Sequence, residues 1–392
     1  MNIVFSDEIF PEKVVKSIFL AGPSPRSATA FWRKNDWRKD AIKFLEANGY
    51  DGTVYIPIPK NKFFDQDSND SSWSYDNQIE WECQARARAD ALVFWIPRQK
   101  EMPGLTTNIE FGEDLHKPNI FYGRPDEAES CRYLDKRVLD NGKLVHSNME
   151  SLFTEVIDYL DEGSLRKEGE TEVPLCIWKS PSFKSWYQNL RENGNKLLSF
   201  DLKETISVGT QREFLFFFSA KVNIWVEKEQ RYKANECIFS RTNISSVVSY
   251  YVDPETKERT IALAKEFRSP VSNKEGFVYE LPGGSAFDDQ SYVKNAQSEY
   301  WEEMGVDVDQ SRFKLVSERQ LAATFGTHTS HLYKLELNKE EFEQLQARSL
   351  VEHEMGLHND ELIYVVLVKE KDLYDLPVDY TTLGMIFEGL NR

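Results

Sequence analysis

The stretch "IEWECQARARADALVFWIPR" (residues 79–98) decides the fold of the first part of the chain. Residues 79–89 have a helical pattern, and residues 90–97 are too uniformly apolar for a strand at the edge of a sheet. Similar segments alternate around it, with strands expected at 17–22, 53–59 and 119–123 and helices at 31–50 and 106–116. This alternation predicts an α/β domain with a parallel sheet and helices on both faces.

The second half of the sequence has longer β-type segments. These segments are residues 213–227, 244–253, 259–267, 331–337 and 362–368. Helices are expected at 291–304 and 380–390, and the mixture indicates a mixed sheet. Residues 161–173 are polar, charged and contain glycine, so we predict a linker between domains at 1–160 and 174–392.

The composition excludes several classes of protein. Forty per cent of the 392 residues are hydrophobic, which is enough to build buried cores. A formal net charge of −17 without a long basic run would repel a nucleic acid polymer, whereas small phosphorylated ligands are compatible with it. The cysteines and histidines show no disulfide or zinc pattern. With no signal peptide or long apolar run in the sequence, we expect a cytoplasmic protein without a membrane partner.

Three glutamates follow a pair of glycines in "ELPGGSAFDDQSYVKNAQSEYWEEMGV" (residues 280–306). Glu299, Glu302 and Glu303 are spaced i, i+3 and i+4, so a helix places their carboxylates on one face. Magnesium prefers oxygen ligands and is usually held by a few carboxylates together with substrate phosphates. Three acids alone are more simply explained by a solvated helix face. The glycines and the fixed spacing favour a metal site instead.

This segment resembles the signature of the Nudix hydrolases, with Gly284 and Gly305 at matching positions beside the three glutamates. The resemblance implies an α/β/α sandwich over residues 174–392, including an N-terminal extension. It also implies Mg²⁺ (or Mn²⁺) held by Glu299, Glu302 and Glu303, with Glu302 and Glu303 also in catalysis. Gln290 and Ser298 replace a glutamate and an arginine of the signature, so either a working hydrolase or a domain that only binds nucleotide remains open.

The flanking sequence narrows the expected Nudix substrate. Residues 261–284 are similar to the ADP-ribose pyrophosphatase branch, in which an arginine precedes the glycine loop; here it is Arg268. Arg268 could bind a phosphate or a base, or be a surface arginine at a strand end. Relatives often take a catalytic base from a later polar loop, and the candidates in residues 352–361 are Glu352, Glu354 and Glu361.

Three N-terminal motifs together resemble the nucleoside 2-deoxyribosyltransferase-like family, over about residues 15–130. They are "SIFLAGP" (17–23), "WECQARARADALVFWIPR" (81–98) and "GLTTNIEFG" (104–112). The resemblance implies a flavodoxin- or Rossmann-like sheet and a nucleophile, Glu110, that attacks the anomeric carbon and expels the base. By position, Glu82 contacts the leaving base, with Asp90 nearer the strand start, although a role on the surface of its helix fits Glu82 equally well. Taken alone, Glu110 is more simply explained as an acid stabilised by the helix macrodipole.

The same resemblance suggests substrate contacts from Phe19, Gly22, Asp90 and Asn108, although Phe19 fits a core position equally well. Relatives often hold the sugar with an aspartate a few residues before the nucleophile, and residues 104–108 contain no carboxylate. Both sugar preference and the choice between transfer and hydrolysis are therefore open. Members of this family complete their sites with a neighbouring subunit, which implies a homo-oligomer.

Together the two resemblances predict a bifunctional enzyme that acts on small nucleosides and nucleotides. The N-terminal domain would cleave or exchange an N-glycosidic bond, and the C-terminal domain would hydrolyse a nucleoside diphosphate-linked compound similar to ADP-ribose. Alternatively, the Nudix domain is a nucleotide sensor that regulates the N-terminal enzyme. A third interpretation makes both domains inactive scaffolds.

Overall fold

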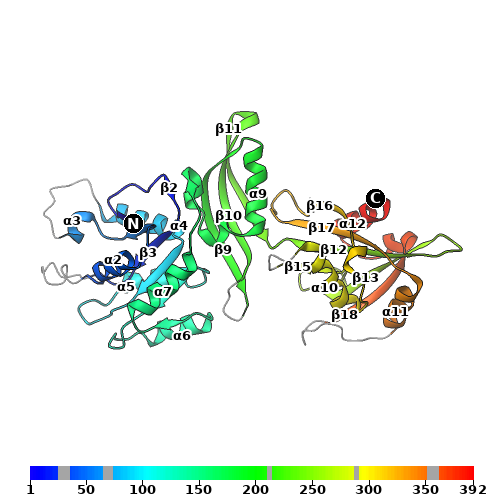
Figure 1. The fold of residues 1–392 in the computed structure, drawn as a ribbon, viewed down its shortest axis with the longest axis horizontal. Coiled ribbons are helices and arrows are strands. Elements are labelled where there is room, and N and C mark those ends of the chain that lie inside the picture. Colours follow the sequence, from blue (N-terminus) through cyan, green and yellow to red (C-terminus); the bar gives the residue numbers. More distant parts are fainter. Residues whose placement is uncertain (25–35, 65–73, 210–213, 287–290, 351–361) are drawn as a thin grey trace. The chain divides into compact units, whose positions relative to one another are not determined.

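The computed structural model describes residues 1–24, 36–64, 74–209, 214–286, 291–350 and 362–392 (Figure 1). The chain divides into two compact units, unit 1 (residues 1–240) and unit 2 (residues 241–392). Unit 1 contains a parallel sheet flanked by helices, and unit 2 contains a mixed sheet. The fold class expected from the sequence is therefore confirmed.

Unit 1 is built around a six-stranded sheet in the order β1-β4-β3-β5-β6-β7, in which every pair of neighbours is parallel. The strands are β1 (Asn2–Phe5), β3 (Ser17–Ala21), β4 (Thr53–Ile56), β5 (Ala91–Trp95), β6 (Ile120–Gly123) and β7 (Val145–His146). Every residue of β3, β4, β5 and β6 is buried. Burial on both faces explains why these strands are continuous apolar runs rather than alternating ones.

Helices cover both faces of this sheet. On one face, α2 (Trp37–Ala47) and α7 (Met149–Leu160) contribute to a single hydrophobic core. On the other, α4 (Tyr75–Arg88), α5 (Leu105–Asp114) and α6 (Arg132–Asp140) contribute to a second core. Because the strands are parallel, all their carboxyl ends meet at one edge of the sheet, which is where ligand sites form in such folds.

The segment 161–173, expected as a linker, lies inside unit 1. It contains β8 (Arg166–Lys167), which pairs with β2 (Lys13–Val14), and the short helix η1 (Glu168–Glu172). Arg166 is completely buried and pairs with Asp90 at 2.5 Å. Most charged side chains of this segment are exposed or half-buried, but Arg166 anchors it to the interior of unit 1.

Unit 1 continues past this segment into a second, smaller sheet. After α8 (Leu175–Trp178), α9 (Pro181–Glu192) packs on a three-stranded sheet in the order β11-β10-β9. The strands are β9 (Lys196–Val208), β10 (Phe214–Val226) and β11 (Arg231–Arg241). Residues 174–240, expected as part of the C-terminal domain, therefore group with unit 1.

Unit 2 is a mixed sheet with helices on both faces. Its main strand order is β14-β13-β12-β17-β16, with β15 paired to β12 and β18 to β13. The strands are β12 (Ile244–Val252), β13 (Arg259–Phe267), β14 (Phe277–Glu280), β15 (Gly283–Ser285), β16 (Lys314–Gln320), β17 (Thr329–Glu336) and β18 (Ile363–Lys369). The β12–β17 pair is parallel, and the other assigned pairs are antiparallel. One core contains residues of α10 (Tyr292–Met304) and α11 (Lys339–Ser349), and another contains residues of α12 (Tyr380–Asn391).

Candidate functional site

Two glutamates from neighbouring helices form an acid pair in unit 1. Glu82 lies on α4, whose first turn is capped by the Ser74 hydroxyl accepting from the Asn77 N–H at 3.2 Å. Glu110 lies on α5, which begins after Gly104, a residue with φ +62° that suits glycine. Glu110 is only 9% exposed, and its carboxyl group is hydrogen-bonded to that of Glu82. Residues 28 positions apart in the sequence thus share one polar site.

An ion pair one helical turn away fixes the two helices. Arg86 follows Glu82 by four residues on α4, and Asp114 follows Glu110 by four residues on α5. Arg86 Nε donates to Asp114 Oδ2 at 2.6 Å, and Arg86 Nη2 donates to the Glu110 carbonyl oxygen at 3.4 Å. The Arg86 and Asp114 side chains are 7% and 2% exposed, so this clamp is shielded from solvent and holds the acid pair in register.

Burial and mutual repulsion change how the acid pair binds protons. Burial, with the neighbouring charge of Glu110 adding to it, raises the pKa of Glu82 to about 7. Burial also raises the pKa of Glu110 above its ordinary value, although the charges of Arg86 and Arg38 and the hydrogen bond from Glu82 oppose this rise. A hydrogen bond between two carboxyl groups requires a proton on one of them, so Glu82 and Glu110 share a single proton as a pair.

Arg38 and Gln78 place the pair at the carboxyl edge of the sheet. The Arg38 side chain, completely buried, donates to the carbonyl oxygens of Leu20 at 3.0 Å and Gly22 at 2.7 Å, where β3 ends. Gln78 Nε2 donates to Glu82 Oε1 at 2.6 Å and to the carbonyl of Pro57, just beyond β4, at 2.8 Å. Neither residue was predicted from the sequence; the available signal was an arginine on the apolar face of α2.

Three other residues predicted to contact substrate have different surroundings in the structure. Gly22 follows β3, and a Cβ atom there would overlap the Trp95 carbonyl oxygen, so close packing requires glycine. Phe19 is completely buried in a core and is not available to a substrate. Asn108 accepts a hydrogen bond from Arg98 and lines a pocket that does not include Glu110.

Asp90 lies at the opposite edge of the sheet from the acid pair. It directly precedes β5 and is completely buried, with its carboxylate bonded to Arg166, the Ser17 hydroxyl and the Leu175 N–H. Its distances to Arg166 Nη1 and Nη2 are 2.7 Å and 2.5 Å. Such an enclosed, fully bonded carboxylate is structural, which corrects the expectation of a substrate contact.

In unit 2, two of the three predicted metal ligands meet the glycine loop. The Glu303 carboxylate on α10 accepts from the Gly283 N–H at 3.1 Å. A Cβ atom on Gly284 would overlap the Glu299 carboxylate, so this glycine permits Glu299 to approach the loop. Glu302 is half-buried on the same helix. Gly305 ends α10 with φ +65°.

The charge at this loop fits a divalent cation. Burial, followed by repulsion from Glu299, raises the pKa of Glu303 well above its ordinary value, and Glu266 and Glu280 add to the repulsion. A cation would relieve this accumulation of half-buried negative charge. Within the described residues, no three acidic, cysteine or histidine side chains are arranged to hold an ion. The described side chains alone thus do not complete an ion site at this loop, and a Mg²⁺ ion there would need further oxygen ligands from phosphates and water.

The remaining predicted residues of unit 2 are partly accounted for. Arg268 is 45% exposed and pairs with Glu266 at 2.8 Å and Glu280 at 3.2 Å, so it lies beside the acidic loop. Ser298 is exposed on α10. Gln290 and the candidate bases Glu352, Glu354 and Glu361 lie outside the described residues.

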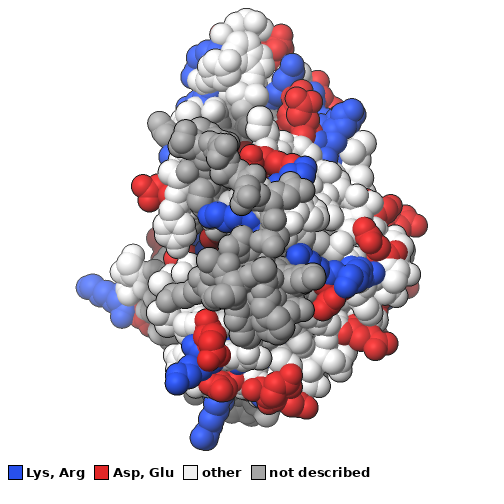
Figure 2. Space-filling model, turned by 90° about the vertical axis from the view of Figure 1, so that its left-hand side faces the viewer, with Lys and Arg blue, Asp and Glu red and all other residues white. Residues whose placement is uncertain are grey.

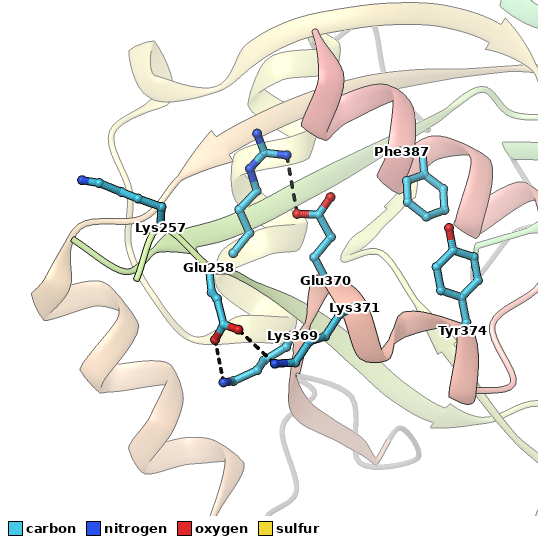
Figure 3. A pocket seen from close by; sticks show the side chains of 8 residues that line it. Lys257, Glu258, Lys369, Glu370, Lys371, Tyr374 and Phe387 are labelled. Carbon is cyan, nitrogen blue, oxygen red and sulfur yellow. Dashed lines mark hydrogen bonds and ion pairs between the residues drawn. The ribbon is translucent and has the colours of Figure 1, made fainter. Parts of the chain in front are cut away.

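A separate pocket of unit 2, with a volume of about 390 Å³, lies where the β12–β13 turn meets the end of β18 (Figure 3). Glu258 bonds both Lys369 and Lys371 there, at 2.7 Å and 2.9 Å, and Arg259 pairs with Glu370 at 3.6 Å. Three of its four basic side chains thus pair with the two acids of the lining, and none of the three glutamates of α10 lines it.

Acidic and basic side chains are interspersed on the face of the protein shown in Figure 2. This mixture is unlike the continuous basic surface that tracks a nucleic acid backbone. Over the described ranges, no helix has the length and apolar character needed to cross a membrane.

The N-terminal part of the chain matches a family model. The model is described as nucleoside 2-deoxyribosyltransferase like, and it matches residues 15–119. This range includes Gly22, Glu82 and Glu110, so the part of unit 1 that carries the acid pair is similar to this family. The match does not reach unit 2, where a Nudix assignment rests on the residues around Gly284 and their geometry alone. No curated protein matches the chain significantly.

Proposed function

We propose, on the premise of this similarity to the nucleoside 2-deoxyribosyltransferase-like family, that unit 1 cleaves or exchanges the N-glycosidic bond of a small nucleoside or nucleotide. The observation that carries this proposal is the hydrogen-bonded pair of Glu82 and Glu110 at the carboxyl edge of the sheet. One acid of this pair holds a proton near neutral pH and the other accepts from it, which supplies an acid and a nucleophile side by side.

In the proposed reaction, a Glu110 carboxylate oxygen bonds to the anomeric carbon as the bond from that carbon to the base nitrogen breaks. The electron pair of the broken bond leaves with the base, and Glu82 donates its proton to the base. Water or a second base then attacks the anomeric carbon, and Glu110 departs with its electron pair. Glu82 takes back the proton of the incoming nucleophile. Retaining O-glycosidases use two carboxyl groups in a similar way.

The direct test is product analysis with the full-length protein. Deoxynucleosides, ribonucleosides, nucleotides and NAD would each be incubated with the protein, and mass spectrometry would measure free base and glycosyl products. We expect base release from at least one member of this panel. If no base is released from any of them, the proposal fails.

We predict a bell-shaped pH profile for this activity. Glu110 must lose its proton to attack, so the rate rises as the pH increases through the pKa of Glu110. Glu82 must keep its proton to donate it, so kcat/KM falls as pH rises through about 7. Glu82→Gln should abolish this alkaline fall and lower the rate by about 10²-fold or more.

The matched control is Glu80→Gln, an exposed glutamate two residues earlier on α4. This variant should keep the wild-type profile. An alkaline fall that persists unchanged in Glu82→Gln would show that another group carries the proton.

For unit 2 we propose Mg²⁺- or Mn²⁺-dependent hydrolysis of a nucleoside diphosphate-linked compound similar to ADP-ribose. Glu299 and Glu303 would hold the ion, with Glu302 available from the same helix, and the bound ion would polarise a phosphoryl oxygen and activate water. Arg268 would bind a phosphate of the substrate. The support is the crowding of Glu299 and Glu303 against the glycine loop, together with the raised pKa of Glu303.

We expect Glu303→Gln to weaken Mn²⁺ binding and lower metal-dependent hydrolysis, each by about tenfold or more, because it removes an anionic ligand from a poorly solvated position. Calorimetric titration with Mn²⁺ would measure the first effect, and release of a nucleoside monophosphate from ADP-ribose would measure the second. Glu343→Gln, on α11 and with its carboxylate 57% exposed, should change neither quantity. Equal Mn²⁺ affinity in the two variants would exclude Glu303 as a ligand.

A second candidate function for unit 2 is nucleotide sensing. It is favoured by Ser298, which replaces the arginine of the Nudix signature, and by the partner of Glu303, which is a backbone N–H rather than a cationic side chain. Calorimetry separates the two functions. Tight ADP-ribose binding without turnover would support sensing, and rapid formation of AMP would support hydrolysis.

A further inference from the structure

A pocket between α5 and α6 is lined by two arginines and no acid. Its volume is about 420 Å³, within the range of small-molecule sites. Its polar lining comes from Arg98, Asn108, Ser130 and Arg137. Asn108 and Glu110 lie on one helix two residues, or about 200°, apart, so the pocket opens on the other side of α5 from the acid pair.

Arg98 differs from the other buried arginines of unit 1 in having no aspartate partner. The side chains of Arg38, Arg86 and Arg166 pair with aspartates at 3.3 Å, 2.6 Å and 2.5 Å. Arg98 is 8% exposed, about as buried as Arg86, yet neither it nor Arg137 forms an ion pair with any described residue. A buried charge without a counter-ion is costly, and a bound anion would remove that cost.

The hydrogen bonds of Arg98 are also incomplete. Its Nη1 donates to the Ser130 carbonyl oxygen at 3.0 Å, and its Nη2 donates to Asn108 Oδ1. A guanidinium carries five N–H donors, so three are left without an acceptor in the described structure, and Nε is both buried and unpaired. Because Arg98 can only donate, Oδ1 of Asn108 faces it, which leaves the Asn108 amide N–H groups as further donors.

We propose that this pocket binds the phosphate group of a small phosphomonoester. A phosphomonoester carries about 1.5–2 negative charges at pH 7. This charge balances two arginines better than the single charge of a carboxylate ligand would. Guanidinium groups bind phosphate oxygens in pairs of parallel hydrogen bonds. The remaining wall includes Phe111, Tyr133 and Leu134, so the organic part of the ligand would contact apolar and aromatic surface.

The test is calorimetric titration of the full-length protein with phenyl phosphate, which has no sugar or base for the acid pair to act on. We expect Arg137→Ala to weaken phenyl phosphate binding by about tenfold or more, the loss usual for a charge-assisted hydrogen bond. Arg132→Ala removes the same charge from an exposed position on α6 outside the pocket lining, and it should bind as the wild type does. Arg98→Lys keeps the buried charge but loses the forked donors, so it should also bind less tightly.

Three further measurements discriminate among ligands and sites. Benzoate should bind more weakly than phenyl phosphate, and equal affinity would overturn the assignment to phosphate. Inorganic phosphate should also bind more weakly, and equal affinity would overturn the assignment to a monoester. Glu110→Gln should leave phenyl phosphate binding unchanged, which separates this site from the proposed active site. Absence of phenyl phosphate binding, or equal weakening by Arg132→Ala and Arg137→Ala, would overturn the proposal altogether.

Discussion

Glu110→Gln is expected to lower base release by about a thousandfold or more, because it replaces the proposed nucleophile with a neutral amide of the same shape. The same variant should fold normally and unfold at an equal or higher temperature. Glu110 is 9% exposed and burial raises its pKa, so its charge costs free energy in the folded state. Loss of activity together with retained stability is typical of a functional acid rather than a structural one.

Glu113→Gln is the matched control for this prediction. Glu113 lies three residues further along α5, its side chain is 59% exposed, and its carboxylate pairs with Arg86 Nη2 at 2.7 Å. We expect less than a threefold change in rate, because solvent screens the mostly exposed Glu113 carboxylate and Arg86 keeps its buried partner Asp114. Product mass spectrometry and thermal unfolding would be measured on both variants. Glu110→Gln protein that releases base at the wild-type rate would refute the assigned role.

Asp90→Asn is expected to destabilise unit 1 by about 3–5 kcal/mol, because it leaves the completely buried charge of Arg166 without its counter-ion. The substitution also disturbs the bonds from the Ser17 hydroxyl at 3.0 Å and the Leu175 N–H at 2.7 Å. Asp90 thus connects β3, β5, β8 and α8, and its loss should be felt across unit 1 rather than at one surface.

Asp51→Asn provides the comparison for Asp90→Asn. Asp51 pairs with Lys16 at 3.1 Å, but its side chain is 78% exposed, so we expect a change of less than about 1 kcal/mol. Denaturant titration followed by circular dichroism would compare the first unfolding transition of each variant with that of the wild type. Equal midpoints for the two variants would mean that the buried pair contributes no more than the exposed one.

Much of the fold could be predicted from the sequence because its signals are local. The four central strands of unit 1 are apolar runs, and burial on both faces produces that pattern directly. In unit 2 the strands β12, β13, β17 and β18 were each recognisable. Their pairing was not, because the parallel contact of β12 with β17 joins segments about 85 residues apart and local sequence carries no record of it.

In the candidate sites, too, residues on one helix could be predicted together, whereas contacts between separate elements could not. Spacing on one helix could be predicted, so Glu299 and Glu303 were expected together and both meet the glycine loop. The meeting of Glu82 with Glu110 depends on two helices and the sheet beneath them, and only the family resemblance pointed to it. Arg38 and Arg166 were not expected in the interior, because a charged residue in a sequence gives no indication that its partner is buried with it.

The pairing of Asp90 with Arg166 bears on when unit 1 can fold during its synthesis on the ribosome. The last strand of the parallel sheet, β7, ends at His146, some twenty residues before Arg166. A nascent chain that has exposed only this sheet would hold a bare carboxylate in its interior. We therefore expect the parallel sheet to become fully stable only after β8 and α8 have been translated. For the same reason, a fragment that ends at residue 160 would contain Asp90 but lack Arg166, which neutralises it.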